Sequence, residues 1–255
     1  MTARLPREKH VELMDLLTGW GEKKWCKVKQ LQSLVGKLNH ACTVVPQGRT
    51  FLRRLFDLLK GTHHPRRFIR LNKQCQLDIT WWREFLPTWD GVYFFDLPDW
   101  APLPDLSLST DAAGSKGYGA FYNDEWFHGA WLPSQQPHNI TYKELFPIVI
   151  ACHLWGSRWS RKRIQFLCDN EGVVAVITSG TSKDQSIMQL LRLLFSSSAR
   201  YNFKVMAKHV PGKTNSIADA LSRFNMQAFF QLAPQARRTP VAVPAELLAH
   251  LTSNL

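Results

Sequence analysis

The feature that most constrains the fold is a run of alternating apolar and polar residues that ends in a carboxylate. Residues 106–111 read Leu-Ser-Leu-Ser-Thr-Asp, Gly114 and Gly117 then allow a turn, and residues 119–122 begin a second alternating run. This pattern predicts two antiparallel strands. Asp111 therefore lies in a predicted strand, where an ionised carboxylate is costly beside a core unless it is paired or metal-bound. A surface Asp at a strand end is the alternative interpretation.

After this hairpin the chain alternates between predicted strands and helices. Strands are predicted at residues 125–131, 164–167 and 203–210, and helices begin near Thr141, Glu171, Asp184 and Ser216. Asp184 and Asn215 stand where helix N-caps are expected. This order of elements predicts an α/β sheet with helices on its faces.

Three further carboxylates lie at the ends of these elements, namely Glu144, Asp169 and Asp219. Each has a structural interpretation of its own: Glu144 would complete a capping box with Thr141, Asp169 would cap a helix, and Asp219 would lie on a helix surface. Capping does not explain Asp111 in a strand, nor why one sheet edge would gather all four groups.

Clustered carboxylates repel one another unless cations neutralise them, and hard oxygen ligands suit Mg²⁺ or Mn²⁺. Two such ions would clamp a phosphodiester between them. Asp111, Glu144, Asp169 and Asp219 are therefore predicted as both catalytic and metal-binding residues.

The first 104 residues predict a separate, all-α module. Apolar residues recur at helical spacing in segments 6–18, 28–42, 51–59 and 76–86. Pro98, Pro102 and Pro104 then form a stiff connector, which places a domain boundary near residue 104. The α/β domain spans 105–225, and residues 226–255 show no clear pattern and are expected to be a C-terminal tail.

The charge balance favours a polyanionic partner. Lys and Arg outnumber Asp and Glu by 32 to 20, which gives a net charge of +12, and the chain has ten Trp and fifteen Phe on which bases can stack. Arg49, Arg53 and Arg54 line one predicted helix, where they would either track phosphates or solvate the helix face. Nucleic acid is the predicted partner.

The cysteines and the N-terminus bear on the compartment. Five cysteines without a C-x-x-C pair support neither a disulfide framework nor a zinc knuckle. The first residues include Arg4, Pro6 and Arg7 rather than an apolar signal segment, and no apolar run is long enough for a membrane helix. A cytoplasmic or nuclear protein without a membrane partner is expected.

Four sequence blocks resemble the acidic motifs of ribonuclease H domains. They are Asp111-Ala-Ala with Gly117-Tyr-Gly-Ala-Phe, Tyr142-Lys-Glu-Leu-Phe-Pro-Ile-Val, Phe166-Leu-Cys-Asp-Asn, and the block from His209 to Arg223 with its N-x-x-A-D-x-L-S-R core. The last block is similar to that of retroelement reverse transcriptases, and residues 227–236 look most like DIRS-type elements, the tyrosine-recombinase retrotransposons. Residues 30–59 resemble the thumb region after the polymerase palm, and the chain has no paired-aspartate polymerase motif.

The resemblance implies a mixed five-stranded sheet flanked by helices, and two-metal hydrolysis of the RNA strand of an RNA/DNA hybrid. It implies that Asp111 bridges two Mg²⁺ ions, or Mn²⁺ in their place. Glu144 and Asp169 would hold the ion beside the leaving 3′-oxygen, and Asp219 the one that activates water. The polymerase part of a longer reverse transcriptase is an implied partner.

Hybrid recognition requires contacts to 2′-hydroxyls, for which Ser115 and Asn170 are candidates. Lys213 occupies the loop where many family members carry a mobile His, and Pro147 falls inside the helix of Glu144, where it removes a backbone donor. Two other interpretations stay open: a catalytically inert nucleic-acid-binding remnant, and an integrase-like or exonuclease relative, which fits the acidic spacing less well.

Overall fold

The computed structural model describes residues 2–62, 64–89, 92–94 and 106–252. The chain divides into two compact units, Met1–Ala101 and Pro102–Leu255. The predicted proline-rich connector falls largely in 95–105, outside the described residues. Within the described part, no helix is both long and apolar enough to cross a membrane.

Unit 1 is built mainly from helices. They are α1 (Arg7–Thr18), α2 (Val28–Ala41), α3 (Arg53–Leu59) and α4 (Lys73–Phe85), with a 3₁₀ turn at Pro46–Phe51. α2 buries a stripe that includes Leu31, Leu34 and Leu38, as its helical spacing predicts. α4 begins before its predicted start because the Asn72 side chain accepts a hydrogen bond from the Cys75 amide at 2.8 Å.

The prediction of an all-α module is wrong in one respect. Two short antiparallel pairs accompany the helices: β1 (Thr2–Arg4) with β4 (Val92–Phe94), and β2 (Trp25–Lys27) with β3 (Phe68–Arg70). Three-residue strands are too short to show a period-two pattern, so the sequence carries no signal for them.

Unit 2 contains the predicted mixed five-stranded sheet, in the order β7-β6-β5-β8-β9. Its strands are β5 (Leu106–Ala112), β6 (Gly117–Tyr122), β7 (Glu125–Ala130), β8 (Arg163–Cys168) and β9 (Lys204–His209). β5, β6 and β7 pair antiparallel, whereas β5, β8 and β9 run parallel. The prediction of a five-stranded sheet flanked by helices is confirmed.

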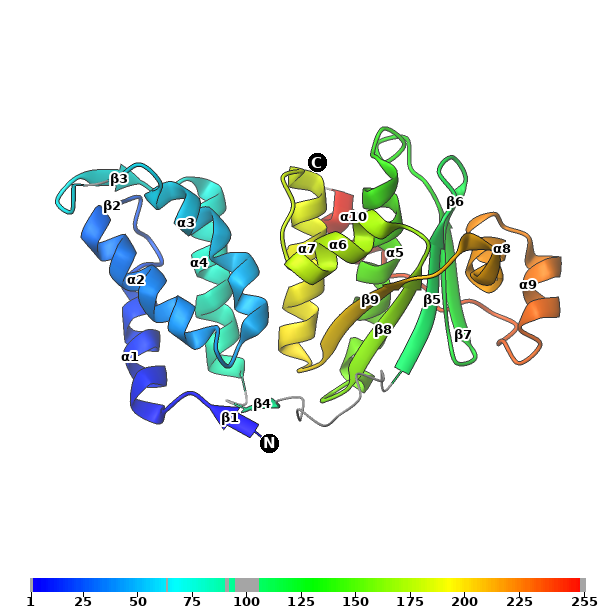
Figure 1. Ribbon diagram of the computed structural model, residues 1–255, viewed down its shortest axis with the longest axis horizontal. Helices are drawn as coiled ribbons and strands as arrows, with labels where there is room; N and C mark the ends of the chain where they lie inside the picture. Colours follow the sequence, from blue (N-terminus) through cyan, green and yellow to red (C-terminus); the bar gives the residue numbers. More distant parts are fainter. Residues whose placement is uncertain (1, 63, 90–91, 95–105, 253–255) are drawn as a thin grey trace. The chain divides into compact units, whose positions relative to one another are not determined.

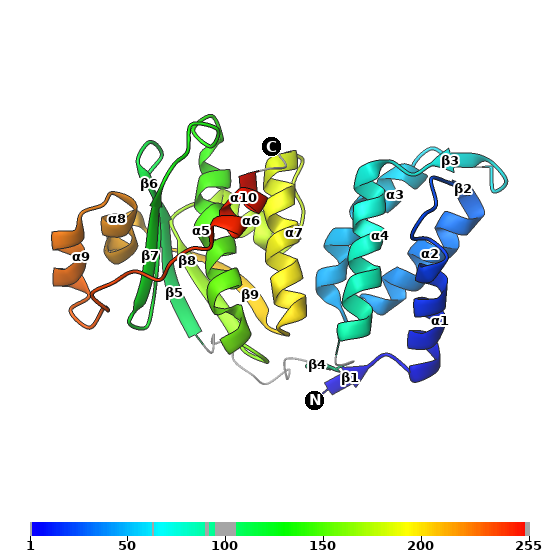
Figure 2. The same ribbon diagram turned by 180° about the vertical axis from the view of Figure 1, so that it is seen from behind.

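Helices cover both faces of this sheet (Figures 1 and 2). One face packs against α5 (Ile140–Trp155), α6 (Glu171–Ser179), α7 (Gln185–Arg200) and α10 (Ala245–Thr252), and the other against α8 (Ser216–Ser222) and α9 (Met226–Leu232). β6 shows the division, because Tyr118 and Ala120 enter the first core and Phe121 enters the second. Every residue of β6 is consequently buried.

The expectation that residues 226–255 form a patternless tail is wrong. Phe229 of α9 is fully buried, with its ring 5.8 Å from that of Phe121 and 5.1 Å from that of Trp126. Leu247 and Leu251 of α10 belong to the core on the opposite face. These helices span seven and eight residues, so their apolar periodicity is too brief to recognise without the surfaces they cover.

Candidate active site

Asp111 is placed at the carboxyl end of β5 and faces α8. Its side chain is buried at 5% exposure, and it accepts a hydrogen bond from the Ser222 hydroxyl. Burial raises the pKa of Asp111 to about 6, with Asp169 and Asp219 adding to the rise and the Ser222 hydrogen bond opposing it. Asp111 thus lies within electrostatic reach of two other predicted site residues.

Glu144 approaches the same place from α5. It is 3% exposed, and burial, followed by Asp111 and Asp169, raises its pKa to about 9. The capping-box interpretation of Glu144 is wrong, because the N-cap of α5 is Asn139, whose side chain accepts a hydrogen bond from the Tyr142 amide at 2.9 Å. Glu144 is therefore directed into the acidic cluster rather than back to the helix terminus.

Asp169 follows β8 directly and is exposed. It does not cap α6, since Asn170 does so by accepting a hydrogen bond from the Val173 amide at 3.1 Å. β5 and β8 are parallel neighbours, so their carboxyl ends meet at one edge of the sheet. Gly212 lies close to Asp169, because a Cβ at Gly212 would come within 2.9 Å of Asp169 Oδ2.

Asp219 reaches the cluster from α8. The start of this helix is tied to β5 by Asn215, whose amide donates to the Thr110 carbonyl at 2.8 Å. The predicted side-chain N-cap by Asn215 is not made. Arg223 Nε donates to Asp219 Oδ1 at 2.6 Å, and Arg223 also lowers the pKa of Asp111.

The structure therefore brings together all four predicted carboxylates. Ligand atoms of Glu144, Cys168 and Asp169 lie within 4.8 Å of one another, and Asp111 interacts electrostatically with Glu144, Asp169 and Asp219. Raised pKa values are the expected result of gathering like charges in a buried place. This oxygen-rich donor set fits Mg²⁺ or Mn²⁺, which would replace protons as the neutralising charge.

Sequence reasoning missed three contributors to this site. Ser222 and Arg223 follow Asp219 by three and four residues, a spacing that places them on the same helix face. Cys168 is buried, its Sγ lies 3.8 Å from Glu144 Oε2, and burial raises the pKa of its thiol. Cys168 therefore remains a neutral donor to Glu144.

The predicted nucleic-acid contacts in unit 2 have different environments. Ser115 is exposed in the turn between β5 and β6, and its carbonyl accepts a hydrogen bond from Gln136 at 3.2 Å. Asn170 uses its carbonyl oxygen as the cap of α6. Lys213 is exposed in the 3₁₀ turn Gly212–Thr214, between β9 and α8.

The three arginines predicted to contact nucleic acid from unit 1 are not equivalent. Arg49 is exposed. Arg53 pairs with Asp57, with Nε and Oδ2 3.3 Å apart. Arg54 is only 22% exposed, and its Nη1 lies 3.2 Å from the Gln74 carbonyl and 3.5 Å from Oδ1 of the buried Asp78. Arg54 thus already has a structural role, which its position in the sequence did not reveal.

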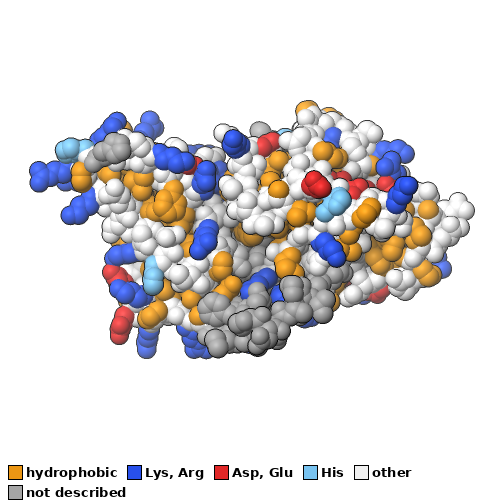
Figure 3. All heavy atoms as spheres, viewed as in Figure 1, with side chains coloured by type: hydrophobic (Ala, Val, Ile, Leu, Met, Phe, Trp, Pro, Cys, Tyr) orange, Lys and Arg blue, Asp and Glu red, His pale blue; other side chains and the backbone are white. Residues whose placement is uncertain are grey.

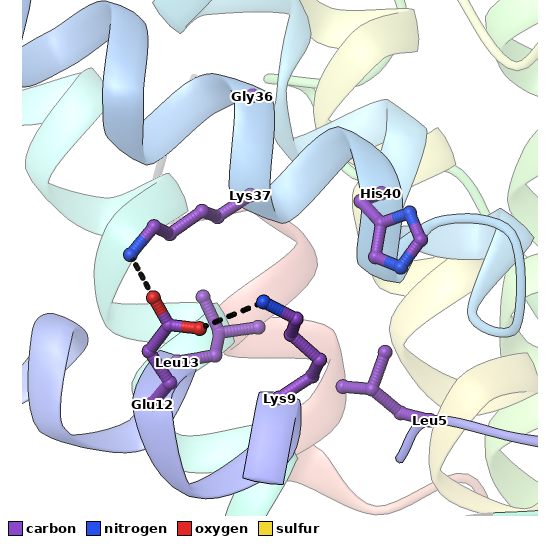
Figure 4. A pocket seen from close by; sticks show the side chains of 7 residues that line it. All are labelled: Leu5, Lys9, Glu12, Leu13, Gly36, Lys37 and His40. Atoms are coloured by element: carbon purple, nitrogen blue, oxygen red, sulfur yellow. Dashed lines mark hydrogen bonds and ion pairs between the residues drawn. The ribbon is translucent and has the colours of Figure 1, made fainter.

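Unit 1 also contains a pocket of about 320 Å³ between α1 and α2 (Figure 4). Glu12 accepts hydrogen bonds there from Lys9 and Lys37, and these contacts lower the pKa of Glu12. Lys9 and Lys37 carry two positive charges against the single negative charge of Glu12, and both ammonium groups are already hydrogen-bonded to that carboxylate. None of the predicted site residues lines it.

Comparisons with protein-family models and with curated proteins give no significant match. Among solved structures, the N-terminal RNase H domain of rv2228c from Mycobacterium tuberculosis, fused to maltose-binding protein, is similar over 51% of this chain and 99% of its own, at 17% identity and a TM-score of 0.38. RNase H1 from the halophilic archaeon Halobacterium salinarum NRC-1 is similar over 47% and 96%, at 15% identity and a TM-score of 0.33.

A third similar structure is the foamy viral protease-reverse transcriptase dRH in complex with double-stranded DNA. It matches 78% of this chain and 35% of its own, at 14% identity and a TM-score of 0.31. These are similarities of backbone structure at low sequence identity.

Proposed function

We propose that unit 2 is a metal-dependent endonuclease that hydrolyses the RNA strand of RNA/DNA hybrids. The observation that carries this proposal is the convergence of Asp111, Glu144, Asp169 and Asp219 at the edge where β5 and β8 end. The motif resemblance supplies the substrate class, and the positive charge of the chain suits a polyanion.

Asp111 would bridge two divalent ions, Glu144 and Asp169 would hold one, and Asp219 would hold the other. When bound, Mg²⁺ or Mn²⁺ supplies positive charge that stabilises the leaving 3′-oxygen, and it lowers the pKa of bound water. Glu144 must lose its proton for this role, since its pKa of about 9 keeps it neutral near pH 7 without a cation. The Ser222 hydroxyl holds the Asp111 carboxylate in place through its hydrogen bond. Arg223 would have to give up its hydrogen bond to Asp219, or leave one oxygen of that carboxylate for the ion.

Substrate selection would come from polar groups around the same edge. Ser115 and Asn170 are proposed to approach 2′-hydroxyls, which distinguish RNA from DNA. Lys213 is exposed in the turn before α8 and would contact a phosphate.

We also propose, on the motif resemblance, that the chain belongs to a DIRS-type reverse transcriptase and that residues 1–104 are its thumb-like module. Adding a polymerase fragment from such an element should then increase hybrid cleavage, whereas an unrelated polymerase should not.

Cleavage of a labelled hybrid in Mg²⁺ tests the proposal. The native chain should cut the RNA strand and leave 5′-phosphate ends, and Asp111→Asn should lower the rate by orders of magnitude. Asp124→Asn is a matched control, because Asp124 is paired with Arg237 outside the cluster. Binding without cleavage in both Mg²⁺ and Mn²⁺ would instead identify an inert remnant, and equal cleavage of duplex DNA would indicate a different nuclease class.

A further inference from the structure

The β2–β3 ribbon, formed by Trp25–Lys27 and Phe68–Arg70, has one buried and one exposed side. Trp25 pairs with Arg70, and Lys27 pairs with Phe68. Between these two pairs, Cys26 and Ile69 point inward and are buried. Further hydrogen bonds extend the pairing, from the Leu71 amide to the Lys24 carbonyl at 2.9 Å and from the Val28 amide to the Arg67 carbonyl at 2.9 Å. The outward side chains therefore rest on a backbone fixed at both ends.

The outward side presents two aromatic rings. Trp25 is 57% exposed and Phe68 is 59% exposed, which makes them the two most exposed large hydrophobic side chains among the described residues. They alternate with cations across the ribbon, and Lys27 Nζ lies 5.6 Å from the centre of the Phe68 ring. The core does not explain either ring, since Cys26 and Ile69 make the inward contacts.

The two segments that carry these rings are strongly basic, although Glu22 immediately precedes the first of them. Segments 23–29 and 64–73 contain no Asp or Glu. Their cations are Lys23, Lys24, Lys27, Lys29, Arg66, Arg67, Arg70 and Lys73. Blue Lys and Arg side chains gather in Figure 3 over the part of unit 1 that holds β2 and β3 in Figure 1. This surface therefore combines a strong positive electrostatic potential with the two flat apolar faces of Trp25 and Phe68.

We propose that the β2–β3 ribbon binds single-stranded nucleic acid, with bases stacked on Trp25 and Phe68 and phosphates held by Lys27, Arg70 and their basic neighbours. Stacking needs exposed base faces, which an unpaired strand offers and a duplex or hybrid hides within its own stack. The ribbon lies in unit 1, so this activity is additional to the nuclease proposed for unit 2 and does not depend on it.

Charge and geometry favour this occupant over a lipid surface. A membrane-binding element buries a broad apolar face, whereas here each ring stands beside a cation in the two-strand register. This alternation matches a polymer in which apolar bases and anionic phosphates also alternate.

Binding of the full-length chain to a labelled oligothymidylate, in EDTA and across a salt series, tests the proposal. Combining Trp25→Ala with Phe68→Ala should weaken binding about tenfold or more with little change in salt slope. Combining Lys27→Gln with Arg70→Gln should lower the log–log slope by roughly 1.4, at about 0.7 for each phosphate on a single strand. Trp25→Phe and Phe68→Tyr should restore stacking and affinity.

Phe56→Ala is the matched control, because Phe56 is 43% exposed on α3 rather than on the ribbon. The ribbon variants should melt near the native temperature, since Trp25 and Phe68 are more than half exposed and Cys26 and Ile69 keep the inward contacts. The proposal fails if the aromatic double variant binds oligothymidylate as tightly as the native chain, or if it loses duplex binding equally. It also fails if these substitutions change only binding to vesicles of phosphatidylserine and phosphatidylcholine. EDTA removes cleavage from the measurement, so failure of the nuclease proposal would be seen separately.

Discussion

Asp111 and Glu144 lie where burial and like charges oppose their ionisation. Both are almost completely buried, and burial is the main cause of their raised pKa values. Asp169 raises the pKa of both groups further, and Asp111 also raises the pKa of Glu144. A cation is the ordinary way to keep such groups charged. Under the proposed function, removal of the cation would therefore destabilise the fold.

The free-energy cost of ionising Asp111 and Glu144 in the folded protein should depend on pH. Folding raises the pKa of Asp111 from 3.8 to about 6 and that of Glu144 from 4.5 to about 9, so the folded state binds more protons than the unfolded state in these windows. The stability that each group contributes is present at acidic pH and is lost as pH rises through its folded pKa. In EDTA, Asp111→Asn should therefore gain stability relative to the native chain as pH rises from about 4 to about 7, by at most about 2 kcal/mol.

Melting temperatures of both proteins at successive pH values provide the measurement. Asp124→Asn is a control of opposite sign, because the Arg237 hydrogen bond lowers the pKa of Asp124 and stabilises the native chain above that pKa. A difference between Asp111→Asn and the native chain that does not change with pH would contradict the coupling of the cluster.

At the scale of elements, the site depends on how closely α8 approaches the sheet. α8 carries Asp219 and packs directly over β6 at Gly119, where a Cβ would lie 2.5 Å from Leu221 Cβ. Gly119 also pairs with Asp111 in the neighbouring strand. A side chain at Gly119 must therefore move the helix that supplies the fourth carboxylate.

We expect Gly119→Ala to lower the free energy of unfolding by about 1–3 kcal/mol, because overpacking displaces side chains and backbone. It should also raise the Mg²⁺ concentration needed for half-maximal cleavage, since Asp219 moves with α8. Chemical denaturation and a Mg²⁺ titration measure the two effects. Gly36→Ala is the control: nothing lies within 4 Å of its added Cβ, so in α2 it should be neutral or stabilise by about 0.5–1 kcal/mol. Identical behaviour of the two variants would exclude close packing at Gly119.

At the scale of the whole molecule, charge is distributed unequally between the two units. Residues 1–104 carry an excess of +7 of the total +12. Positive charge that contacts phosphates steepens the salt dependence of binding, by roughly 0.9 in log–log slope for each phosphate of a duplex. Unit 1 is thus expected to contribute much of the binding affinity for a hybrid.

The corresponding prediction compares the full chain with residues 102–255. The shorter protein should bind a hybrid more weakly and with a shallower salt slope. It must retain α9 and α10, because Phe229, Leu247 and Leu251 belong to the cores of unit 2. Binding in EDTA across a salt series measures both quantities, and circular dichroism checks that the fragment is folded. Equal slopes would show that unit 1 does not contact the hybrid.

The sequence by itself determined the elements whose patterns are long enough to be read. Alternation predicted β5 and β6, helical spacing predicted α2 and α7, and Asp184 was correctly predicted to cap α7, where it accepts from the Ser186 amide at 2.9 Å. The sequence also singled out Asp111, because a carboxylate in a strand has few local explanations. Glu144, Asp169 and Asp219 each had a local explanation, and they were chosen with Asp111 as a set and by the motif resemblance.

Only the tertiary structure decided which local interpretation each polar residue fulfils. Thr141 and Glu144 match a capping box, yet Asn139 caps the helix, and Arg54 looks like a phosphate ligand, yet it lies against buried Asp78. The short β2, β3, α9 and α10 gain most of their stability from surfaces supplied by distant segments. Such contacts join residues far apart in the chain, so neither periodicity nor spacing records them, and the exposed face of the β2–β3 ribbon emerged only when both strands were in place.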